Sequence, residues 1–561
     1  MSKKTYVPKA KAQPQPEVAV KQFTIPYPLL WLSVIVLLLY GGSCYFGYTE
    51  LDDTIFTRDF HEYNEHLGNL LTSFRRGVFD PVNDTYYRPL FLDSMIVNYQ
   101  FSELNAQGYH IINMLLHLLN VCLLYQLLKK TGLQQLPAFL LSLIFAVHPV
   151  LSQAVAWIPG RNDTMLAAFT LGFLLCSISY MQKGRLSSLL LSALFLVLAF
   201  FTKETAVFVP PVAFVLLVIM LRYKWTDKKM LVQYGVWTGA FLLWYAVRAA
   251  ATLKSSYIDP AAITADFVHR LPVVLQYLGK IFLPFNLSVF PILEDTVNYY
   301  GIAALALLAL LLFFAKGKDN RTIIAGFCIF ILFLLPVLLV PASLNEQLFE
   351  HRLYLPVIGI LLVLSQTILF KNNLTERQLL AGGVVATAVL AVVNYNHQQH
   401  FDSPQAFWKE AVRTSPHSAY ANMMLGARTE NKAEGELLMR KAYALNPKEK
   451  YINFYYGVML QNHDSVQASE KYLLAEKKRS GYYECDFYLA RVALERNDLN
   501  AAITYLETFI KTDPANPQAN NNLALLYINT HQKEKATARL RHMREAGLPV
   551  DPALQQQVSN M

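Results

Sequence analysis

Two adjacent carboxylates, Asp52 and Asp53, follow the first apolar stretch of the chain, Leu29 to Tyr48, by only a few residues. The distribution of basic residues predicts that this loop lies on the non-cytoplasmic side of a membrane. A carboxylate at that boundary can accept the proton of an attacking hydroxyl group, which is general-base chemistry. Acidic pairs are also common in solvated loops, so spacing alone leaves both interpretations open, and the membrane context favours the first.

Three cations from distant parts of the chain are predicted to reach the same outer boundary: Arg161, Lys203 and Arg352. Guanidinium and ammonium groups pair strongly with phosphate oxygens, so these three are candidates for holding a phosphate that departs in a reaction. The alternative is structural, because charges near bilayer depth usually find partners inside the protein. Asp163, two residues after Arg161, and Glu204, next to Lys203, are carboxylates available for internal ion pairs.

Histidines with ligand-like spacing occur in two places. One stripe of the second predicted span carries polar residues at i, i+3 and i+7, namely His110, Asn113 and His117. A polar seam between packed helices is favoured there over a metal site. His397, His400 and Asp402 lie at a span end, where an interfacial polar collar is favoured. We therefore expect no cofactor and no metal ligands, while a divalent metal requirement stays open.

The composition is that of a membrane protein: 561 residues, 54% hydrophobic and only 16% charged, with a mean hydropathy of +0.27. Apolar runs of about 20 residues, the length that crosses a bilayer, occur up to residue 394 and not beyond residue 402. Candidate spans are 29–48, 109–129, 135–157, 163–182, 185–202, 205–222, 232–250, 299–315, 321–341, 353–370 and 378–394. The prediction is therefore eleven spans followed by a water-exposed region.

Clusters of lysine and arginine predict the orientation of the spans. They lie in the first 28 residues and at 129–130, 183–185, 222–229 and 316–321, and the positive-inside rule assigns all of them to the cytoplasm. The stretch from Arg270 to Pro291 resembles a further span, but Lys280, Pro284 and Asn286 interrupt it, so we expect a re-entrant or interfacial hairpin. An odd number of crossings then places the C-terminal region on the outer side, together with Asp52.

Three regions follow from this pattern. Residues 1–28, basic and rich in proline and glutamine, are expected to be a disordered cytoplasmic tail. Residues 29–400 are expected to form the membrane domain that carries the chemistry. Residues 401–561 are expected to form an array of repeats on the non-cytoplasmic side.

The water-exposed region repeats with a period of 34 residues. The small and large apolar residues Leu489, Ala490, Ala502 and Leu506 recur as Leu523, Ala524, Ala536 and Leu540. This is the tetratricopeptide period, in which small residues let two helices pack closely. Earlier and less regular copies are marked by Gly457 with Leu473 and by Gly426 with Ala442. An array of about four repeats favours binding of an extended peptide or a partner helix, with a merely structural stack as the alternative.

A transferase that works outside the cytoplasm needs a donor carried in the lipid, because nucleotide-activated sugars are kept in the cytoplasm. A polyprenyl phosphosugar meets that need. Its phosphate is already a good leaving group, so one carboxylate that takes the acceptor proton suffices, whereas a glycosidase needs two carboxylates that flank the bond. A single-step attack inverts the anomeric centre. We expect membrane lipids as surroundings and no nucleic-acid partner.

The ordered motifs resemble those of the transmembrane and tetratricopeptide-repeat (TMTC) protein O-mannosyltransferases of the GT-C glycosyltransferase class. The stretches that carry the resemblance are Leu51-Asp52-Asp53, Tyr87-Arg88-Pro89-Leu90, Gly108-Tyr109-His110 with Asn113 and His117, Phe145-Ala146-Val147-His148-Pro149, Ala154 to Asp163, Lys203-Glu204 and Arg352-Leu353-Tyr354-Leu355-Pro356. No single motif is decisive, but the ordered set is fairly specific and spans nearly the whole chain.

The resemblance implies a GT-C bundle whose first outer loop supplies the catalytic aspartate, a lipid-phosphate mannose donor, and transfer to Ser or Thr of a secreted or periplasmic protein. It also implies supporting roles for Arg88, His110, His148, Asp163, Glu204 and Tyr354. The short array, the minimal tail and Thr205-Ala206, where relatives tend to have glycine, favour a bacterial member with an undecaprenyl-type donor. The bacterial inner membrane is therefore the preferred location and the endoplasmic reticulum membrane the second.

Two other functions stay open. An oligosaccharide polymerase or ligase of cell-surface glycans also has many spans, but its key outer loop usually lies late in the chain and not, as here, in the first loop. A non-enzymatic membrane scaffold explains the repeats and leaves Asp52, Asp53, Arg161 and Lys203 without a role.

Overall fold

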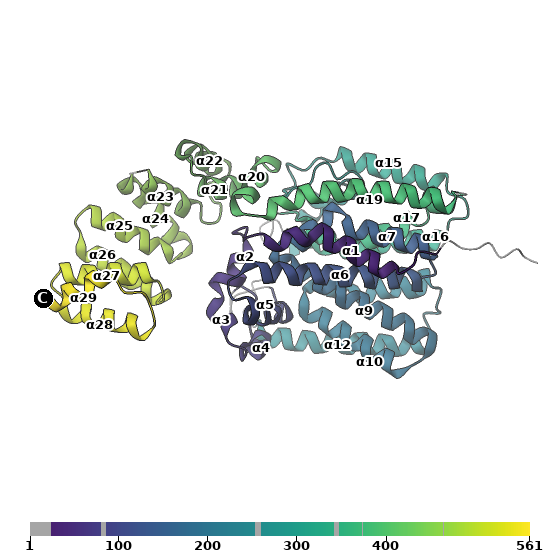
Figure 1. The fold of residues 1–561 in the computed structure, drawn as a ribbon, viewed down its shortest axis with the longest axis horizontal. Helices are drawn as coiled ribbons and strands as arrows, with labels where there is room; N and C mark the ends of the chain where they lie inside the picture. The colour runs from purple at the N-terminus through teal and green to yellow at the C-terminus, as the bar shows by residue number, and fades with distance from the viewer. Residues whose placement is uncertain (1–23, 80–85, 253–259, 341–346, 373, 464) are drawn as a thin grey trace, which may run out of the picture.

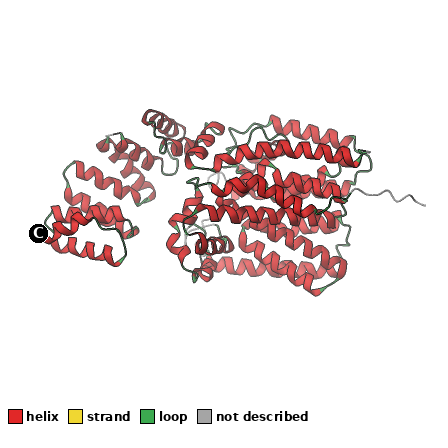
Figure 2. Cartoon of the chain, viewed as in Figure 1, coloured by secondary structure: helices red, strands yellow, loops and turns green. Residues whose placement is uncertain are grey.

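The computed structural model describes residues 24–561 apart from 80–85, 253–259, 341–346, 373 and 464; most of the expected tail, residues 1–28, lies outside them. The described chain consists of helices and connecting loops, with no strand among them (Figure 2). The helices form a bundle of long helices that run side by side and an arched array that extends from one end of it (Figure 1). The predicted all-α architecture, a polytopic bundle followed by an α-solenoid, is confirmed.

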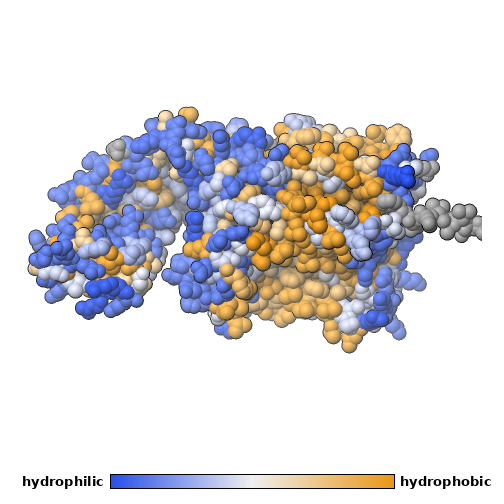
Figure 3. Space-filling view, in the orientation of Figure 1, coloured by the Kyte–Doolittle hydropathy of each residue, from blue (hydrophilic) through white to orange (hydrophobic). Residues whose placement is uncertain are grey.

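Each predicted span coincides with helical segments of the bundle. These are α1 (Pro28–Tyr40), α6 (Ala106–Lys130), α7 (Gln135–Val147) with α8 (Ser152–Ala156), α9 (Arg161–Lys183), α10 (Leu186–Thr202), α11 (Val209–Phe214) with its flanking turns, α12 (Lys228–Ala251), α15 (Tyr299–Phe313), α16 (Asn320–Leu339), α17 (Pro356–Leu364) and α19 (Glu376–Gln398). Among the described residues six helices are long and apolar enough to cross a membrane, and a seventh if the bent pair formed by α7 and the segment Pro149–Ala156 is one span. Apolar residues cover the middle of the bundle and hydrophilic residues both of its ends (Figure 3). The chain is a multi-pass membrane protein.

The interrupted stretch after α12 folds as two short helices, α13 (Pro260–Arg270) and α14 (Pro272–Phe282). An 11-residue helix such as α14 is only about 16 Å long, whereas the bilayer core is about 30 Å thick. The Lys280 ammonium is buried and lies 2.7 Å from a carboxylate oxygen of Glu350. This geometry agrees with the predicted hairpin, because α14 reaches into the bundle without crossing it.

The loop between the first two spans is itself folded. It contains α2 (Asp52–Thr54), α3 (His61–Glu65), α4 (Asn69–Thr72) and α5 (Pro89–Ser102). These helices gather at the end of the bundle from which the array extends (Figure 1). The first acidic pair therefore belongs to a structured cap over the bundle, beside which α5 packs against α6 and α10.

The C-terminal array consists of helix pairs. Its helices are α20 (Pro404–Thr414), α21 (Ala419–Gly426), α22 (Lys432–Leu445), α23 (Ile452–Asn462), α24 (Val466–Ser480), α25 (Glu484–Glu495), α26 (Leu499–Thr512), α27 (Pro517–Asn529), α28 (Lys533–Glu545) and α29 (Pro552–Asn560). Ala490, Ala502, Ala524 and Ala536 are all buried in one apolar cluster. A Cβ atom on Gly457 would lie 2.9 Å from Leu473 Cγ, so the glycine permits the close approach of α23 and α24. The predicted repeats are present.

The first repeat is bound tightly to the bundle. Gly47 N–H donates to the Asp402 carbonyl (2.8 Å), and Arg428 Nε donates to a Glu50 carboxylate oxygen (2.9 Å). Trp408 packs against Phe290 of the bundle, with ring centroids 5.5 Å apart. The repeats and the loop that carries Asp52 therefore meet at one end of the bundle.

Candidate active site

A cavity of about 440 Å³ lies at this end of the bundle. It is lined by residues that are far apart in the sequence: Asp52 of α2, Tyr86 and Arg88 before α5, Trp157, Pro159, Asn162 and Asp163 around the start of α9, Lys203, Glu204, Thr205 and Phe208 after α10, Arg248 of α12, the second half of α16, and Phe349, His351, Arg352, Leu355 and Pro356 before and at the start of α17. Only tertiary packing brings these segments together.

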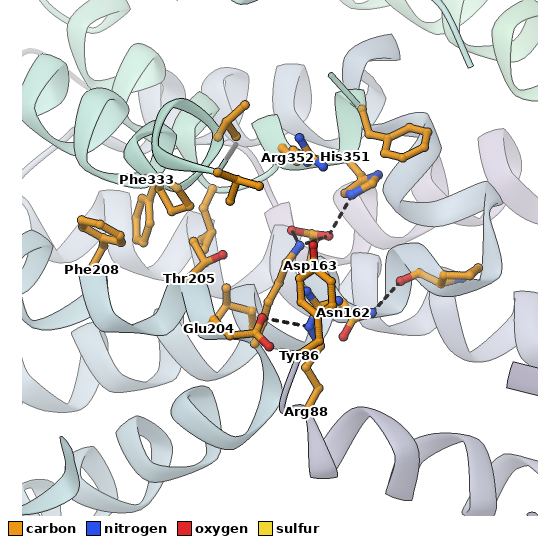
Figure 4. A pocket seen from close by; sticks show the side chains of 18 of the residues that line it. Tyr86, Arg88, Asn162, Asp163, Glu204, Thr205, Phe208, Phe333, His351 and Arg352 are labelled. Atoms are coloured by element: carbon orange, nitrogen blue, oxygen red, sulfur yellow. Dashed lines mark hydrogen bonds and ion pairs between the residues drawn. The ribbon is translucent and has the colours of Figure 1, made fainter. Parts of the chain in front are cut away.

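The lining changes in character across the cavity. Figure 4 shows Phe208 and Phe333 on one side of Asp163, and Asn162 and His351 on the other. Further apolar residues on the α16 side are Pro336, Val337, Leu339 and Val340. The cavity thus has an apolar side, a charged centre and a neutral polar side.

Two ion pairs occupy the charged centre. Lys203 Nζ donates to both carboxylate oxygens of Asp163, at 2.7 and 2.8 Å. Arg88 Nε donates to one oxygen of Glu204 (2.9 Å), and the other oxygen accepts the backbone N–H of Tyr87 (2.8 Å). Each carboxylate therefore holds a cation from another segment in the cavity wall. The internal ion pairs considered from the sequence, Arg161 with Asp163 and Lys203 with Glu204, are replaced by Lys203 with Asp163 and Arg88 with Glu204.

Arg352 is the third cation of the charged centre. Its Nη1 donates to the Gln347 carbonyl (2.8 Å), and its guanidinium lies 5.8 Å from the centre of the Phe349 ring. Arg352 makes no ion pair with a carboxylate of the described residues. A guanidinium has five N–H donors, so most of its donors are available to a ligand.

Arg161 departs from the predicted clamp. Its side chain is fully buried and is not part of the cavity lining. The guanidinium donates to Asn113 Oδ1 (2.9 Å), Asn98 Oδ1 (2.7 Å) and the Tyr109 carbonyl (2.9 Å). Residues two apart on a helix point in different directions, so Arg161 points toward α5 and α6 while Asp163 points into the cavity. This geometry fits the structural alternative for Arg161. Arg88, which was not among the three predicted clamp cations, lines the cavity in its place.

The two adjacent aspartates have different surroundings. The carboxylate of Asp53 is buried and accepts the backbone N–H groups of Thr49 (2.5 Å), Leu51 (3.1 Å) and Thr54 (3.0 Å), together with the Thr49 hydroxyl (2.9 Å). Asp52 lines the cavity, and its carboxylate makes no hydrogen bond or ion pair with a described residue. Asp53 therefore holds the turn, and Asp52 presents a carboxylate to the cavity.

Burial, followed by the nearby negative charge of Asp53, raises the pKa of Asp52 from 3.8 to about 6, while Arg88 and Lys450 oppose the shift. Lys450 belongs to the repeats, in the loop between α22 and α23. The repeats thus contribute to the electrostatic environment of Asp52. A carboxylate with a pKa near 6 is ionised at neutral pH and is a stronger base than an ordinary aspartate.

Three of the predicted supporting residues lie outside the cavity lining and hold the framework. His110 Nε2 is 3.2 Å from the Gly47 carbonyl, His148 Nε2 is 2.8 Å from the Ile281 carbonyl, and the Tyr354 hydroxyl is 2.7 Å from His117 Nδ1. The predicted polar seam on α6 therefore packs the helices together. The other supporting residues, Arg88, Asp163 and Glu204, lie in the cavity wall.

Sequence reasoning missed Tyr86, Trp157, Asn162 and His351 of the lining. All four adjoin or lie within stretches that carry the resemblance, but spacing along the chain does not distinguish them from core residues. No group of three or more His, Cys, Asp or Glu side chains that could hold a metal occurs among the described residues. His397 lies 3.3 Å from the buried Glu350 carboxylate.

Comparison with known proteins agrees with this architecture. The family model described as dolichyl-phosphate-mannose-protein mannosyltransferase matches residues 96–250, and a tetratricopeptide repeat model matches residues 493–556. The human protein O-mannosyl-transferase TMTC3 is 22% identical over 470 residues, which cover 74% of this chain and 51% of the human one. The mouse protein O-mannosyl-transferase TMTC2 is 35% identical over 130 residues, 23% of this chain and 14% of the mouse one. The chain spans about half the length of the first of these relatives.

Among solved structures, ArnT from Cupriavidus metallidurans, bound to undecaprenyl phosphate, has a TM-score of 0.40 and 15% sequence identity, and the match covers 78% of this chain and 77% of that one. The mannosyltransferase model lies over the membrane helices and the repeat model lies behind it, in the order of the two parts of this chain. In this arrangement the chain is similar to the TMTC-type protein O-mannosyl-transferases.

Proposed function

We propose that this protein is an inverting glycosyltransferase that moves a sugar, with mannose as the first choice, from a polyprenyl-phosphate donor to a serine or threonine hydroxyl of an acceptor protein. The observation that carries the proposal is the cavity itself. Its apolar side suits a lipid chain, its central cations suit a phosphate, and Asp52 supplies a carboxylate without an ion-pair partner among the described residues.

In the proposed reaction the acceptor oxygen attacks the anomeric carbon from the face opposite the phosphate. The new carbon–oxygen bond forms as the bond to the phosphate oxygen breaks, and the hydroxyl proton moves to the Asp52 carboxylate. The electron pair of the broken bond leaves with the polyprenyl phosphate. One displacement inverts the anomeric centre, and no second carboxylate is needed to protonate the leaving group.

Of the four described lysine and arginine residues that line the cavity, Lys203, Arg88 and Arg352 are those that we assign to the departing phosphate, and Arg248 is the fourth. Asp163 and Glu204 hold Lys203 and Arg88 in position before the donor arrives. Preorganised cations stabilise charge that grows in the transition state without reorganisation at the moment of reaction. Arg88 thus takes the place in the clamp that Arg161 was expected to fill.

The sugar and the acceptor come to this chain from its relatives. The family description names dolichyl-phosphate-mannose, and the matched proteins are named protein O-mannosyl-transferases. The acceptor protein, which the repeats are expected to hold, has to reach Asp52 at the end of the bundle where the array is bound.

We further propose that Asp52 and the repeats face the periplasm of a bacterial inner membrane, with the lumen of the endoplasmic reticulum as the second choice. Single cysteines introduced at Ser559 in the array and at Glu62 in α3 should both react with a membrane-impermeant thiol reagent from outside. Reaction of either position only after the cytoplasm is opened would overturn this orientation.

The test of the activity uses purified protein in nanodiscs, synthetic undecaprenyl phosphosugars with labelled sugars, and serine- or threonine-containing peptides. We expect label in peptide with the wild type and with Glu62→Gln, a matched control on exposed α3, and no transfer with Asp52→Asn. Label that enters a lipid-linked glycan instead would favour the polymerase or ligase function. Absence of transfer with every sugar and acceptor would favour the scaffold.

A further inference from the structure

Three side chains on the neutral polar side of the cavity carry polar atoms without a partner. Trp157 Nε1, Asn162 Oδ1 and His351 Nδ1 are buried and form no hydrogen bond with a described residue. The three side chains belong to residues that are only 3%, 4% and 8% exposed, in that order, and all three line the cavity. Buried polar groups in native proteins are almost always hydrogen-bonded, so three unpaired atoms at one cavity wall indicate a place for a ligand.

These side chains are held in position by their other contacts. The Asn162 amide nitrogen donates to the Pro159 carbonyl (3.1 Å), which leaves the amide oxygen unpaired. The His351 ring lies between Trp157 and Phe349, with ring centroids 5.4 and 5.3 Å away. Its Nε2 lies 3.8 Å from an Asp163 carboxylate oxygen, and its buried Nδ1 has no partner among the described residues. The wall is therefore prepared before a ligand binds.

The types of the unpaired atoms indicate the class of ligand. An indole N–H only donates, an amide oxygen only accepts, and a neutral imidazole nitrogen does one or the other. Hydroxyl groups both donate and accept, so a neutral ring with several hydroxyl groups can pair with all three atoms. A phosphate cannot, because it offers no donor to the Asn162 oxygen when it is fully ionised.

The position of these atoms agrees with that class. Asn162 and His351 lie across Asp163 from the aromatic residues Phe208 and Phe333 (Figure 4). A donor with its lipid chain on the apolar side and its phosphate at the central cations would carry its sugar on the side of Asn162 and His351. The apolar side, the charged centre and the neutral polar side of the cavity then follow one another in the same order as the lipid, the phosphate and the sugar of a polyprenyl phosphosugar.

We infer that Trp157, Asn162 and His351 form the subsite that binds the hydroxyl groups of the donor sugar. The inference rests on the proposed function and deepens it, because it assigns sugar selectivity to residues that make no contact with the phosphate. Trp157 donates to one hydroxyl, Asn162 accepts from another, and His351 selects a third through Nδ1. None of the three takes part in proton transfer.

The test compares the binding of two lipids, undecaprenyl phosphomannose and undecaprenyl phosphate, to the full-length protein in nanodiscs. Trp157→Phe, which keeps an aromatic ring without the N–H, should weaken binding of the phosphomannose about 3- to 10-fold, the effect of one neutral hydrogen bond. It should leave binding of undecaprenyl phosphate within about twofold of the wild type. His351→Gln has no polar atom at the Nδ1 position and should weaken binding of the phosphomannose to a similar extent. The amide of His351→Asn reaches that position, so this variant should bind the phosphomannose more tightly than His351→Gln does.

Deoxy-mannose donors then identify the hydroxyls. A donor that lacks the hydroxyl bound by Trp157 should bind the wild type and Trp157→Phe equally. The inference is overturned if the variants weaken both lipids alike, which indicates a collapsed cavity, or if they weaken neither, which indicates that water fills the wall. If the wild type prefers the phosphomannose and the variants remove that preference, but no sugar is transferred to any acceptor, the subsite stands and the proposed function fails.

Discussion

The acidic pair offers the sharpest test of the site, because the structure assigns opposite effects to the same substitution at neighbouring positions. Asp52→Asn keeps the shape of the side chain and removes the base. Loss of a general base lowers a rate by roughly 10²–10⁴-fold. Asp53→Asn keeps Asp52 intact and disturbs the turn that presents it.

The two variants should also differ in the sign of their effect on stability. The folded-state pKa of Asp52 is raised from 3.8 to about 6. The free energy of unfolding therefore falls as the pH rises from about 4 to about 6, and above that range the ionised carboxylate exerts its full destabilising effect. The neutral amide of the Asp52→Asn variant removes this cost at pH 7, and a shift of about two pKa units sets its upper size near 3 kcal/mol. We expect Asp52→Asn to raise the free energy of unfolding by about 1–3 kcal/mol.

Asp53→Asn should lower the free energy of unfolding. One carboxylate oxygen accepts from Leu51 and Thr54, and the other accepts twice from Thr49. An amide nitrogen in either position meets at least one backbone N–H from which it cannot accept, although the Thr49 hydroxyl can turn and accept from the amide. One or two hydrogen bonds to a charged group are lost, at about 1.5–3 kcal/mol each. Burial also raises the pKa of Asp53, so removal of its charge offsets part of this cost, and we expect a net loss of about 1–3 kcal/mol.

The assay pairs thermal unfolding in one detergent with the transfer rate per folded molecule at pH 7. The reasoning predicts a stabilised and inactive Asp52→Asn and a destabilised Asp53→Asn that retains turnover at low temperature. A stable, inactive Asp53→Asn beside an active Asp52→Asn would refute the assignment of the two roles.

Three other measurements test the site and its framework. Because Asp52 must be ionised to accept a proton and its pKa is about 6, kcat/KM should rise tenfold per pH unit below pH 6 and level off above it, and a flat profile from pH 4.5 to 7 would exclude it as the base. Arg161→Ala should lower the free energy of unfolding by several kcal/mol, about 1–3 kcal/mol for each buried acceptor left unpaired. Arg352→Ala should leave stability unchanged and lower turnover. Equal unfolding curves for the two variants would contradict the structural role of Arg161. Lys280→Met leaves the fully buried Glu350 carboxylate without its cation and should lower the free energy of unfolding by roughly 3–5 kcal/mol. Adding Glu350→Gln should recover most of that stability in the same unfolding assay. If the effects of the two substitutions simply add, the two charges are not coupled.

The membrane bundle and the repeats could be read from the sequence because both depend on local patterns. Backbone groups in lipid must be hydrogen-bonded within the segment, so every span has to be a continuous apolar run, and each run predicted between residues 29 and 394 coincides with helix. The 34-residue spacing of Ala490 and Ala524 likewise predicts helix packing, since small residues are needed wherever two helices approach closely.

The pairing of charges could not be read in this way. Lys203 stands beside Glu204 in the sequence, yet it pairs with Asp163, 40 residues away, and Glu204 pairs with Arg88, 116 residues away. Neighbouring residues at a helix end point in different directions, so proximity in sequence does not predict contact. The direction of Arg161 could not be read from the sequence either, because it depends on the first turn of α9 and on the polar groups of α5 and α6 around it.

Apolar runs, the 34-residue period and the placing of charges at the ends of the spans are all visible in the order of the residues. Which carboxylates and cations share a cavity is not, because it depends on how the helices pack. Asp52 and Asp53 are identical in type and adjacent in position, so no pattern distinguishes them. The turn around Thr49 surrounds Asp53 with N–H groups and leaves Asp52 in the cavity, because the direction of a side chain depends on how the backbone packs in three dimensions.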